Sequence, residues 1–415
     1  MVDQPITVYG TYWCPDCKRS KKFLGEQQIP YKWVDIEQDD EARQVVEQLN
    51  QGKRIIPTIV FADGSVLVEP SNAELAAKLG METKARSEFY DVIIVGGGVA
   101  GLTAALYLAR EGIETLVVEK SGLGGQAAIT EKIENYPGFP EGISGAELTQ
   151  RMVTQARRFG VEFLQAQEVT SIHVMDPYRF VDTGDGTRYC AHALLIATGA
   201  DYRRLNVRGE EEYIGSGIHF CATCDGPFYK GAEHIVVVGG GNSAAEEGLF
   251  LTKFAPKVTL LVRGDRLSAS QIAQDEVLNT PQMEVKFNTA VKEFRGNGKL
   301  SAVVTQNQQT GAVEELYPTA VFIFIGQRPN IQLVKGLVEL DAYDYIITGH
   351  DLMYLLDDPA SSQKRPQRPP FNMETSTPGI FAAGDVRKGA TAQIASAAGE
   401  GASAAIAIRD YLRLK

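Results

Sequence analysis

The hydrophobic and polar positions of the N-terminal stretch switch between the strand period and the helix period. "ITVYG" and "YKWVDI" have the spacing of strands, whereas the segment after Pro15 and "DEARQVVEQLN" have helical spacing. "TIVF" and "VLV" flank an Asp-Gly turn, which predicts a hairpin, and Ser71 or Asn72 caps a last helix. The pattern predicts a small β-α-β-α-β-β-α domain over residues 1–80 and a polar, flexible linker at 81–88.

A second pattern starts with the buried strand Val92–Val95. The strand runs into the glycine turn Gly96-x-Gly98-x-x-Gly101, and a helix and a second strand ending at Glu119 follow. The glycines let the backbone approach a pyrophosphate, whose charge lies at the helix N-terminus, and the acid is placed for a ribose hydroxyl. Strand, turn, helix and acid together predict a dinucleotide-binding unit that suits the adenosine half of FAD.

The same kind of unit recurs later in the chain. "HIVVV" leads into Gly239-x-Gly241-x-x-Ala244, and the next strand, "VTLLV", ends at Arg263 rather than at an acid. An arginine at this position accommodates a 2′-phosphate, so the second unit predicts a nicotinamide nucleotide, NADPH in preference to NADH. Two such units in one chain imply two cofactors.

The first nucleotide-binding domain is expected to consist of two separate segments, with the second domain inserted between them. "LLIATGA" closes a strand before the second unit, and "GIFAAGDV" with a small-residue helix returns to the first. The fold class is therefore α/β. The expected division is 1–80 for the small domain, 81–88 for the linker, 89–200 and 327–415 for the first nucleotide-binding domain, and 201–326 for the second.

Composition and charge narrow the range of functions. The net charge of −11 argues against nucleic acid and against an anionic membrane as the main partner. The N-terminus lacks the basic and apolar regions of a signal peptide, and no apolar run reaches the roughly 18 residues of a membrane-spanning helix. We therefore expect a cytoplasmic protein.

Four of the five cysteines form two Cys-x-x-Cys pairs, Cys14 with Cys17 and Cys221 with Cys224, while Cys190 stands alone. In a reducing compartment such pairs are usually catalytic or metal-binding. The two pairs lie roughly two hundred residues apart, far beyond zinc-site spacing, and no histidine follows at ligand spacing, so no metal is expected. Cys14 precedes a helix rich in Lys and Arg, which favours a thiolate.

Residues 89–415 resemble the low-molecular-weight, bacterial-type thioredoxin reductases. The matching stretches are "GGGVAG", "GLGGQ", "IENYPGF", "ATGA", "CATCDG", "GGGNSAAEE", "IGQRPN", "TSTPGIFAAGDVR" and "AGEGA". Residues 5–79 are similar to glutaredoxins, and most to the mycoredoxin branch, through "YWCPDC", "IIPT", "FADGS" and "EPSNAEL". The resemblance implies a thioredoxin-like domain fused to two Rossmann-like, three-layer ββα domains that bind FAD and NAD(P)H.

The resemblance also implies roles for single residues. Cys224 would be the flavin-side sulfur, Cys221 the sulfur that attacks the outgoing disulfide, and Asp225 the acid for the leaving thiolate, although a plain turn residue is the alternative for Asp225. Pro57 would follow a cis peptide bond. The implied cofactor residues are, for FAD, Gly96, Gly98, Gly101, Glu119, Gly125, Gln126, Asn135, Thr198, Gly199, Gly384, Asp385 and Gln393, and, for the nicotinamide nucleotide, Gly239, Gly241, Asn242, Ser243, Arg263 and Arg266.

The chain departs from the family pattern at the second nucleotide site. Where the family has a His-Arg-Arg cluster and a later arginine, this chain has Val262, Gly264 and Ser268, with Arg263 retained and Arg266 new. Two guanidiniums can hold a 2′-phosphate, but fewer donors discriminate less, so NADH stays an alternative.

An insertion at residues 349–370 is the other departure. Its Pro, Ser and basic content predicts an exposed, mobile loop. It is either a surface insertion without a function of its own or a basic segment that binds the acidic remainder of the chain, including the N-terminal domain.

The sequence thus predicts an electron relay in a homodimer. Electrons would pass from NADPH through FAD and Cys221–Cys224 to Cys14–Cys17, and on to thioredoxin-like, protein or low-molecular-weight disulfides. A dedicated peroxiredoxin reductase and a non-enzymatic, redox-sensing flavoprotein are the alternatives, and reduction of the flavin by ferredoxin is a third, narrower one. The sequence does not identify the terminal electron acceptor. It also leaves open whether Cys221 passes electrons to Cys14 of the same chain or of the other protomer in the dimer.

Overall fold

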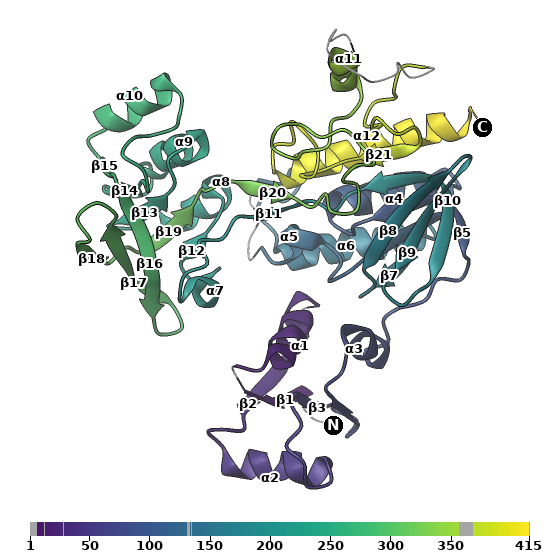
Figure 1. Ribbon diagram of the computed structural model, residues 1–415, viewed down its shortest axis with the longest axis horizontal. Coiled ribbons are helices and arrows are strands. Elements are labelled where there is room, and N and C mark those ends of the chain that lie inside the picture. Colours follow the sequence, from purple (N-terminus) through teal and green to yellow (C-terminus); the bar gives the residue numbers. More distant parts are fainter. Residues whose placement is uncertain are drawn as a thin grey trace. The chain divides into compact units, whose positions relative to one another are not determined.

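The computed structural model describes residues 6–414 except for 12, 28, 131–132, 134 and 357–367. The chain divides into two compact units, whose elements are labelled in Figure 1. The first unit comprises Met1–Thr130, Ile143–Gly199 and Pro329–Lys415, and the second comprises Glu131–Gly142 and Ala200–Arg328. Each unit is assembled from separate stretches of chain, so its core depends on contacts between residues far apart in sequence.

The N-terminal part of the first unit is a four-stranded sheet packed against helices. Its elements are β1 (Ile6–Gly10), α1 (Pro15–Glu26), β2 (Tyr31–Asp35), α2 (Asp40–Leu49), β3 (Thr58–Val60), β4 (Val66–Val68) and α3 (Asn72–Lys78). The strand order is β2-β1-β3-β4, with β1 parallel to β2 and antiparallel to β3. Val8, Phe23 and Leu75 are fully buried in the core. Ser71 caps α3 in a capping box with Glu74, and the predicted element order is confirmed.

The linker after α3 makes hydrogen bonds at several of its residues. The carbonyl of Glu82 accepts the N–H of Gln165 at 3.0 Å. The carboxylate of Glu162 accepts the N–H of Arg86 at 2.6 Å and the hydroxyl of Tyr90 at 2.8 Å. The expectation of a flexible linker is therefore wrong for these residues, because the edge of β7 (Glu162–Gln165) supplies partners for its backbone.

The large sheet of the first unit combines parallel strands with an antiparallel meander. Its strand order is β7-β6-β5-β10-β9-β8, and β21 pairs with β10. The parallel strands are β5 (Phe89–Val95), β6 (Thr115–Glu119), β7, β10 (Arg188–Ile196) and β21 (Ile380–Ala382), and β8 (Val169–Met175) and β9 (Tyr178–Thr183) are antiparallel. The helices are α4 (Val99–Arg110), α5 (Gly125–Ala128), α6 (Gly145–Arg158), α11 (His350–Leu356) and α12 (Ile394–Leu412).

Both faces of the parallel strands are buried, which explains the unbroken apolar run in β5. Val92 and Ile94 pack against helices α4, α6 and α12, whereas Ile93 and Val95 pack against the core that includes the meander. Figure 1 shows α4 and α12 side by side. A Cβ on Gly401 would lie 2.2 Å from the carbonyl oxygen of Ala100, so only glycine allows α12 this close to α4.

The second unit is a five-stranded parallel sheet in the order β12-β19-β13-β14-β15. These strands are β12 (Ile218–His219), β13 (Ile235–Val238), β14 (Val258–Leu261), β15 (Met283–Lys286) and β19 (Ala320–Ile323). The helices are α7 (Glu210–Tyr213), α8 (Ala222–Asp225), α9 (Asn242–Leu251) and α10 (Gln271–Asn279), and β16 (Thr289–Gly296), β17 (Leu300–Asn307) and β18 (Val313–Leu316) form an antiparallel sheet. A short ribbon pairs β11 (Ala200–Tyr202) with β20 (Gln327–Pro329). The α/β class with two Rossmann-like domains is confirmed, and none of the described helices combines the length and hydropathy of a bilayer-spanning segment.

The insertion at 349–370 begins as structured chain. Residues His350–Leu356 form α11, Leu352 is buried, and Asp351 lies 3.3 Å from the ammonium of Lys388. At the other end, Arg368 donates two hydrogen bonds of 2.7 Å to the buried carboxylate of Glu374. The expectation of an exposed, mobile loop is therefore wrong at both flanks, and residues 357–367 lie outside the described part of the chain.

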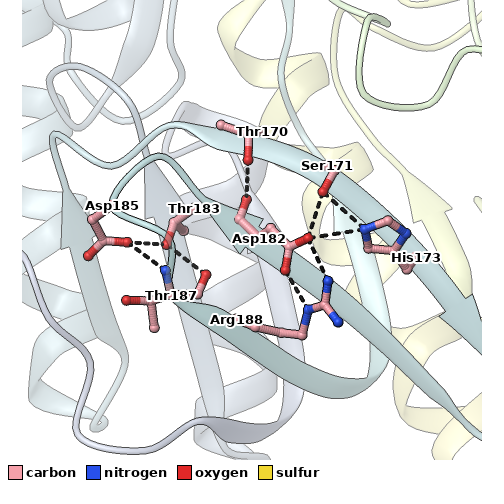
Figure 2. Close-up of polar contacts among 8 residues, drawn as sticks. All are labelled: Thr170, Ser171, His173, Asp182, Thr183, Asp185, Thr187 and Arg188. Atoms are coloured by element: carbon pink, nitrogen blue, oxygen red, sulfur yellow. Dashed lines mark hydrogen bonds and ion pairs between the residues drawn. The ribbon is translucent and has the colours of Figure 1, made fainter.

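A polar cluster ties the meander strands together (Figure 2). Asp182 accepts hydrogen bonds from the Arg188 guanidinium at 2.6 and 2.9 Å and from the Ser171 hydroxyl at 2.8 Å. His173 Nε2 lies 3.0 Å from Asp182 and 3.1 Å from Ser171. Because one imidazole nitrogen meets both the carboxylate and the hydroxyl, the cluster lacks the geometry of a catalytic triad and is a structural cross-strand contact.

We expect Asp182→Asn to destabilise the first unit in a pH-dependent way. Hydrogen bonds from Arg188 and Ser171 hold the pKa of Asp182 well below its usual range. Because the folded-state pKa is lowered, the stabilisation is present above the unfolded pKa of about 4 and is lost as the pH falls through the folded value. The variant should lower the free energy of unfolding by about 1–2 kcal/mol at about pH 7, and by much less in acid. Urea unfolding measures this, with exposed Glu168→Gln as the control. Equal losses at both pH values would contradict it.

Candidate active site

The first cysteine pair lies at the start of α1. Cys14 is the N-cap residue, and its sulfur accepts the N–H of Cys17 at 3.1 Å. Cys14 is 5% exposed and Cys17 is fully buried. Burial, with the hydrogen bond to Cys14, raises the pKa of the Cys17 thiol to about 12. Cys17 is therefore held as a thiol, and Cys14, whose sulfur lies at the N-terminus of α1, is the sulfur suited to attack.

The backbone around this pair leaves no room for larger residues. A Cβ on Gly10 would lie 2.6 Å from the sulfur of Cys17 and 2.7 Å from the Trp33 ring. The Ile56–Pro57 peptide bond is cis, as the family resemblance implied. The sulfur of Cys14 lies 3.9 Å from the carbonyl oxygen of Ile56. The redox pair is therefore packed between β1 and the segment before β3.

The basic residues that follow Cys17 are partly engaged elsewhere. Arg19 pairs with Asp16 and donates a hydrogen bond of 3.0 Å to the carbonyl of Pro70. The Lys21 ammonium lies 4.3 Å from the centroid of the Trp33 ring, and burial lowers the pKa of Lys21. Arg19 thus offsets the Asp16 charge that would oppose a thiolate on Cys14.

The second cysteine pair lies on the second unit, at the start of α8. Cys221 is disulfide-bonded, whereas Cys14, Cys17 and Cys190 carry free thiols. The side chain of Cys224 lies outside the described part of the structure. The described residues contain no group of three or more His, Cys, Asp or Glu side chains that could hold a metal ion.

A carboxylate from α9 holds the redox segment in place. Glu247 accepts the N–H of Ala222 at 2.7 Å, and burial raises the pKa of the Glu247 carboxyl. A Cβ on Gly226 would touch Leu251 at 3.0 Å, so the turn after α8 packs closely on α9. Sequence analysis did not assign a role to Glu247, although it lies inside the quoted "GGGNSAAEE" stretch.

Asp225, the expected acid, is half-buried at the end of α8. Its Oδ2 lies 3.4 Å from Nδ1 of His219, and His219 Nε2 lies 2.6 Å from the Tyr229 hydroxyl. Sequence analysis missed both partners. The available signal was their place within a few residues of the cysteines, in "HFCATCDGPFY".

The first glycine turn has the shape that a dinucleotide pyrophosphate needs. Gly96 has φ +109°, and a Cβ there would lie 2.3 Å from the carbonyl oxygen of Ala197. A Cβ on Gly101 would lie 2.1 Å from the carbonyl oxygen of Gly96, whereas one on Gly98 would meet open space. The N-terminus of α4 carries no side-chain cap, so its N–H groups can receive an anion.

Glu119 lies at the carboxyl end of β6, next to this turn. Its buried carboxylate accepts the N–H groups of Gly97 at 2.7 Å and of Ser121 at 2.8 Å. A carboxylate has about four acceptor positions, so it can still receive a ribose hydroxyl. Gly124 donates its N–H to the Gly97 carbonyl at 2.7 Å, which brings the segment with Gly125 beside the turn.

Asp385 is the residue whose environment points most directly to a ligand. Burial and the nearby Glu400 raise its pKa to about 6. Its carboxylate has no partner within the described residues, whereas Glu400 binds the Gly384 N–H at 2.8 Å and the Arg387 guanidinium at 2.7 Å. A half-buried, unpaired carboxyl fits a hydroxyl-bearing ligand such as the ribityl chain of a flavin.

The other residues expected around FAD are placed as follows. Gln393 is the N-cap residue of α12, and Gln126 is exposed on α5. Thr198 donates a hydrogen bond of 2.7 Å to the carbonyl of Asn330, next to Gly199. Asn135 lies in the stretch that belongs to the second unit, so the structure does not group it with the rest.

The second glycine turn has the same close backbone approach. Gly239 has φ +151°, and a Cβ there would lie 2.3 Å from the carbonyl oxygen of Phe324. Gly241 caps α9 without a side-chain hydrogen bond, and Asn242 and Ser243 begin the helix. The Asn242 side chain accepts the N–H of Ser270 at 2.6 Å.

Arg263 and Arg266 lie on the loop that follows β14. Both side chains are exposed, and neither guanidinium has a partner within the described residues. The loop returns to the glycine turn, because the Ser268 N–H donates to the Gly240 carbonyl at 2.7 Å. Two unpaired guanidiniums beside a dinucleotide turn fit a phosphate on the ribose.

The chain is similar to known protein families, to single proteins and to solved structures. The family model described as pyridine nucleotide-disulphide oxidoreductase matches residues 90–401, and the glutaredoxin model matches residues 6–67. Thioredoxin reductase of Treponema pallidum is 40% identical over 323 residues, 78% of this chain and 97% of that protein. Thioredoxin reductase of Bacillus subtilis is 40% identical over 326 residues, 78% of this chain and 95% of that protein. The crystal structure of thioredoxin reductase from Streptococcus pyogenes matches with TM-score 0.69 and 40% identity, over 79% of this chain and 99% of that chain.

The raised pKa of Cys17 predicts selective alkylation of the reduced protein. At about pH 8, brief iodoacetamide treatment should label Cys14 and leave Cys17 unlabelled, because a thiol with a pKa of about 12 holds almost no thiolate there. Peptide mass mapping measures the labelling, and the protein unfolded in urea is the control, in which both cysteines should react alike. Equal labelling of both cysteines in the folded protein would contradict the assignment.

Proposed function

Since the chain belongs to the pyridine nucleotide-disulphide oxidoreductases, as a thioredoxin reductase-type enzyme with an N-terminal glutaredoxin domain, we propose that it is a self-contained electron relay. Electrons pass from NADPH through FAD to Cys221–Cys224, then to Cys14–Cys17, and on to external disulfides. The observation that carries this proposal is that one chain holds two Cys-x-x-Cys pairs, Cys14 with Cys17 at the start of α1 and Cys221 with Cys224 at α8.

FAD and NADPH are the proposed cofactors. The first glycine turn, Glu119 and the unpaired carboxyl of Asp385 would hold the flavin nucleotide, and the second turn with Arg263 and Arg266 would hold the nicotinamide nucleotide. When bound, the two cofactors would supply the hydride transfer and the electron pair that opens a disulfide. The protein groups orient the cofactors and keep water away from the reacting atoms.

The cysteines carry the electrons onward by thiol–disulfide exchange. The Cys221 thiolate attacks the sulfur of Cys14 in the Cys14–Cys17 disulfide, and Cys17 leaves and takes up a proton. Cys224 then attacks Cys221, which restores the Cys221–Cys224 disulfide and releases Cys14 as a thiolate. Two electrons move in each exchange, and Asp225 donates the proton that a leaving thiolate needs. The high pKa of Cys17 supports its role as the group that ends each cycle as a thiol.

The remaining assignments concern partners and location. The outgoing substrates are thioredoxin- or glutaredoxin-type protein disulfides, low-molecular-weight disulfides or a peroxiredoxin, all of which a Cys14 thiolate can attack. We assign the protein to the cytoplasm, where its thiols stay reduced, and expect a homodimer. Nucleic acid and membrane are not proposed partners, in keeping with the net charge of −11.

Counting electrons tests the relay. Anaerobic titration of the full-length holoenzyme with NADPH should reduce wild type by one more two-electron equivalent than Cys14→Ser, because that variant cannot form the second disulfide. Stopped-flow absorbance with thiol quantification measures the uptake. Cys190→Ser is the control and should behave as wild type, since Cys190 is a lone thiol on β10. Equal uptake by wild type and Cys14→Ser would reject transfer between the pairs.

Nucleotide preference tests the second glycine turn. The double variant Arg263→Ala with Arg266→Ala should raise the KM for NADPH by about tenfold or more and leave the KM for NADH unchanged, because only NADPH carries the 2′-phosphate. Steady-state turnover with each nucleotide measures this. Arg208→Ala, at an exposed site elsewhere in the second unit, is the matched control. A wild type that uses both nucleotides with equal efficiency would exclude the phosphate clamp.

A further inference from the structure

A histidine and a tyrosine lie behind Asp225, in the same segment that carries Cys221. His219 ends β12, and Tyr229 ends the 3₁₀ turn Gly226–Tyr229 that follows α8. The imidazole Nδ1 lies 3.4 Å from Asp225 Oδ2, and Nε2 lies 2.6 Å from the Tyr229 hydroxyl. One ring therefore contacts a carboxylate on one side and a phenol on the other.

The imidazole is held in this position by its surroundings. Its side chain is 11% exposed, and β12 pairs with β19 in a register that places His219 opposite Phe322. The imidazole packs against the Phe322 ring at 5.3 Å and against the Tyr229 ring at 5.2 Å between centroids. Within the described residues, Asp225 from α8 and Tyr229 from the 3₁₀ turn are the titratable groups that contact it, while β19 contributes the apolar Phe322.

The hydrogen-bonding capacity of a neutral histidine matches the two contacts. One ring nitrogen of neutral imidazole donates and the other accepts. If the Tyr229 hydroxyl donates to Nε2, then Nδ1 carries the proton and points it at Asp225. The 3.4 Å separation is long for a hydrogen bond, but such contacts shorten when the reacting complex forms.

We propose that His219 is the positioning residue that returns a proton to Asp225, with Tyr229 as its second partner. This inference rests on the proposed function, in which Asp225 is the acid. Opening the Cys221–Cys224 disulfide takes two electrons, which the cofactors would supply, and leaves two thiolates, of which one takes up a proton and the other stays a thiolate for attack. Asp225 gives one proton to a thiolate and becomes a carboxylate. The Nδ1 proton of His219 moves to Asp225, the hydroxyl proton of Tyr229 moves to Nε2, and water replaces the Tyr229 proton.

The experiment uses the full-length holoenzyme with NADPH and a small aromatic disulfide as the acceptor, over about pH 6–9. His219→Gln should lower kcat on the order of tenfold at neutral pH and move the fall of kcat on the alkaline side to lower pH, because Asp225 is then reprotonated slowly. Anaerobic reduction of the flavin by NADPH should stay as fast as in wild type, since that step precedes the disulfide. Tyr229→Phe, which removes only a hydroxyl, should give a smaller loss of the same kind.

Controls separate a relay from a packing role. His234→Gln alters another half-buried histidine of the same unit, one that contacts Thr259 at 2.9 Å, and should leave the pH profile unchanged. In a double-mutant cycle, His219→Gln should add no loss to Asp225→Asn, because His219 acts through Asp225. Additive losses, or a uniform fall of kcat at every pH, would overturn the proposal. A wild type that fails to reduce any disulfide with NADPH would instead overturn the proposed function.

Discussion

Backbone packed directly against backbone at the two glycine turns is the contact on which the rest of the structure depends. At Gly96 and at Gly239, any side chain would meet a carbonyl oxygen of the neighbouring strand connection at 2.3 Å. Glycine at these points lets each helix begin immediately after its strand, with N–H groups that no side chain caps. In the second unit the same helix continues to Glu247, which caps the segment that carries Cys221. Helix α9 therefore both begins at the second glycine turn and holds the segment that carries Cys221.

The two cysteine pairs have different groups around their sulfur atoms and backbone. At α1 the sulfur of Cys14 caps its own helix, and burial keeps Cys17 protonated. At α8 the N–H of Ala222 donates to the carboxylate of Glu247 on α9. Asp225, the residue after Cys224, contacts His219. In the proposed mechanism, the first arrangement would keep a proton on the sulfur of Cys17, whereas the second would take a proton from the Asp225 carboxyl. This difference suits a relay in which electrons leave α8 and arrive at α1.

Sequence patterns predicted local structure well and long-range contacts poorly. Strands β5 and β13, the glycine turns and the capping Ser71 followed from periodicity and residue type, because these features depend on neighbours along the chain. The linker was expected to be flexible because it is polar, yet Glu162 binds its backbone from a distant part of the chain. The insertion was expected to be a loop because of its Pro and Ser content, yet it begins with helix α11.

The sequence by itself determined the fold class, the two units of strand, glycine turn and helix, and the two Cys-x-x-Cys pairs, since spacing and residue type decide these within a few tens of residues. Only the tertiary structure decided which groups surround each reactive atom. The unpaired carboxyl of Asp385 beside Glu400, the cap from Glu247 to Ala222 and the contact of His219 with Asp225 all join different elements. Such contacts depend on how strands and helices pack, and packing is set by the whole core rather than by any one segment.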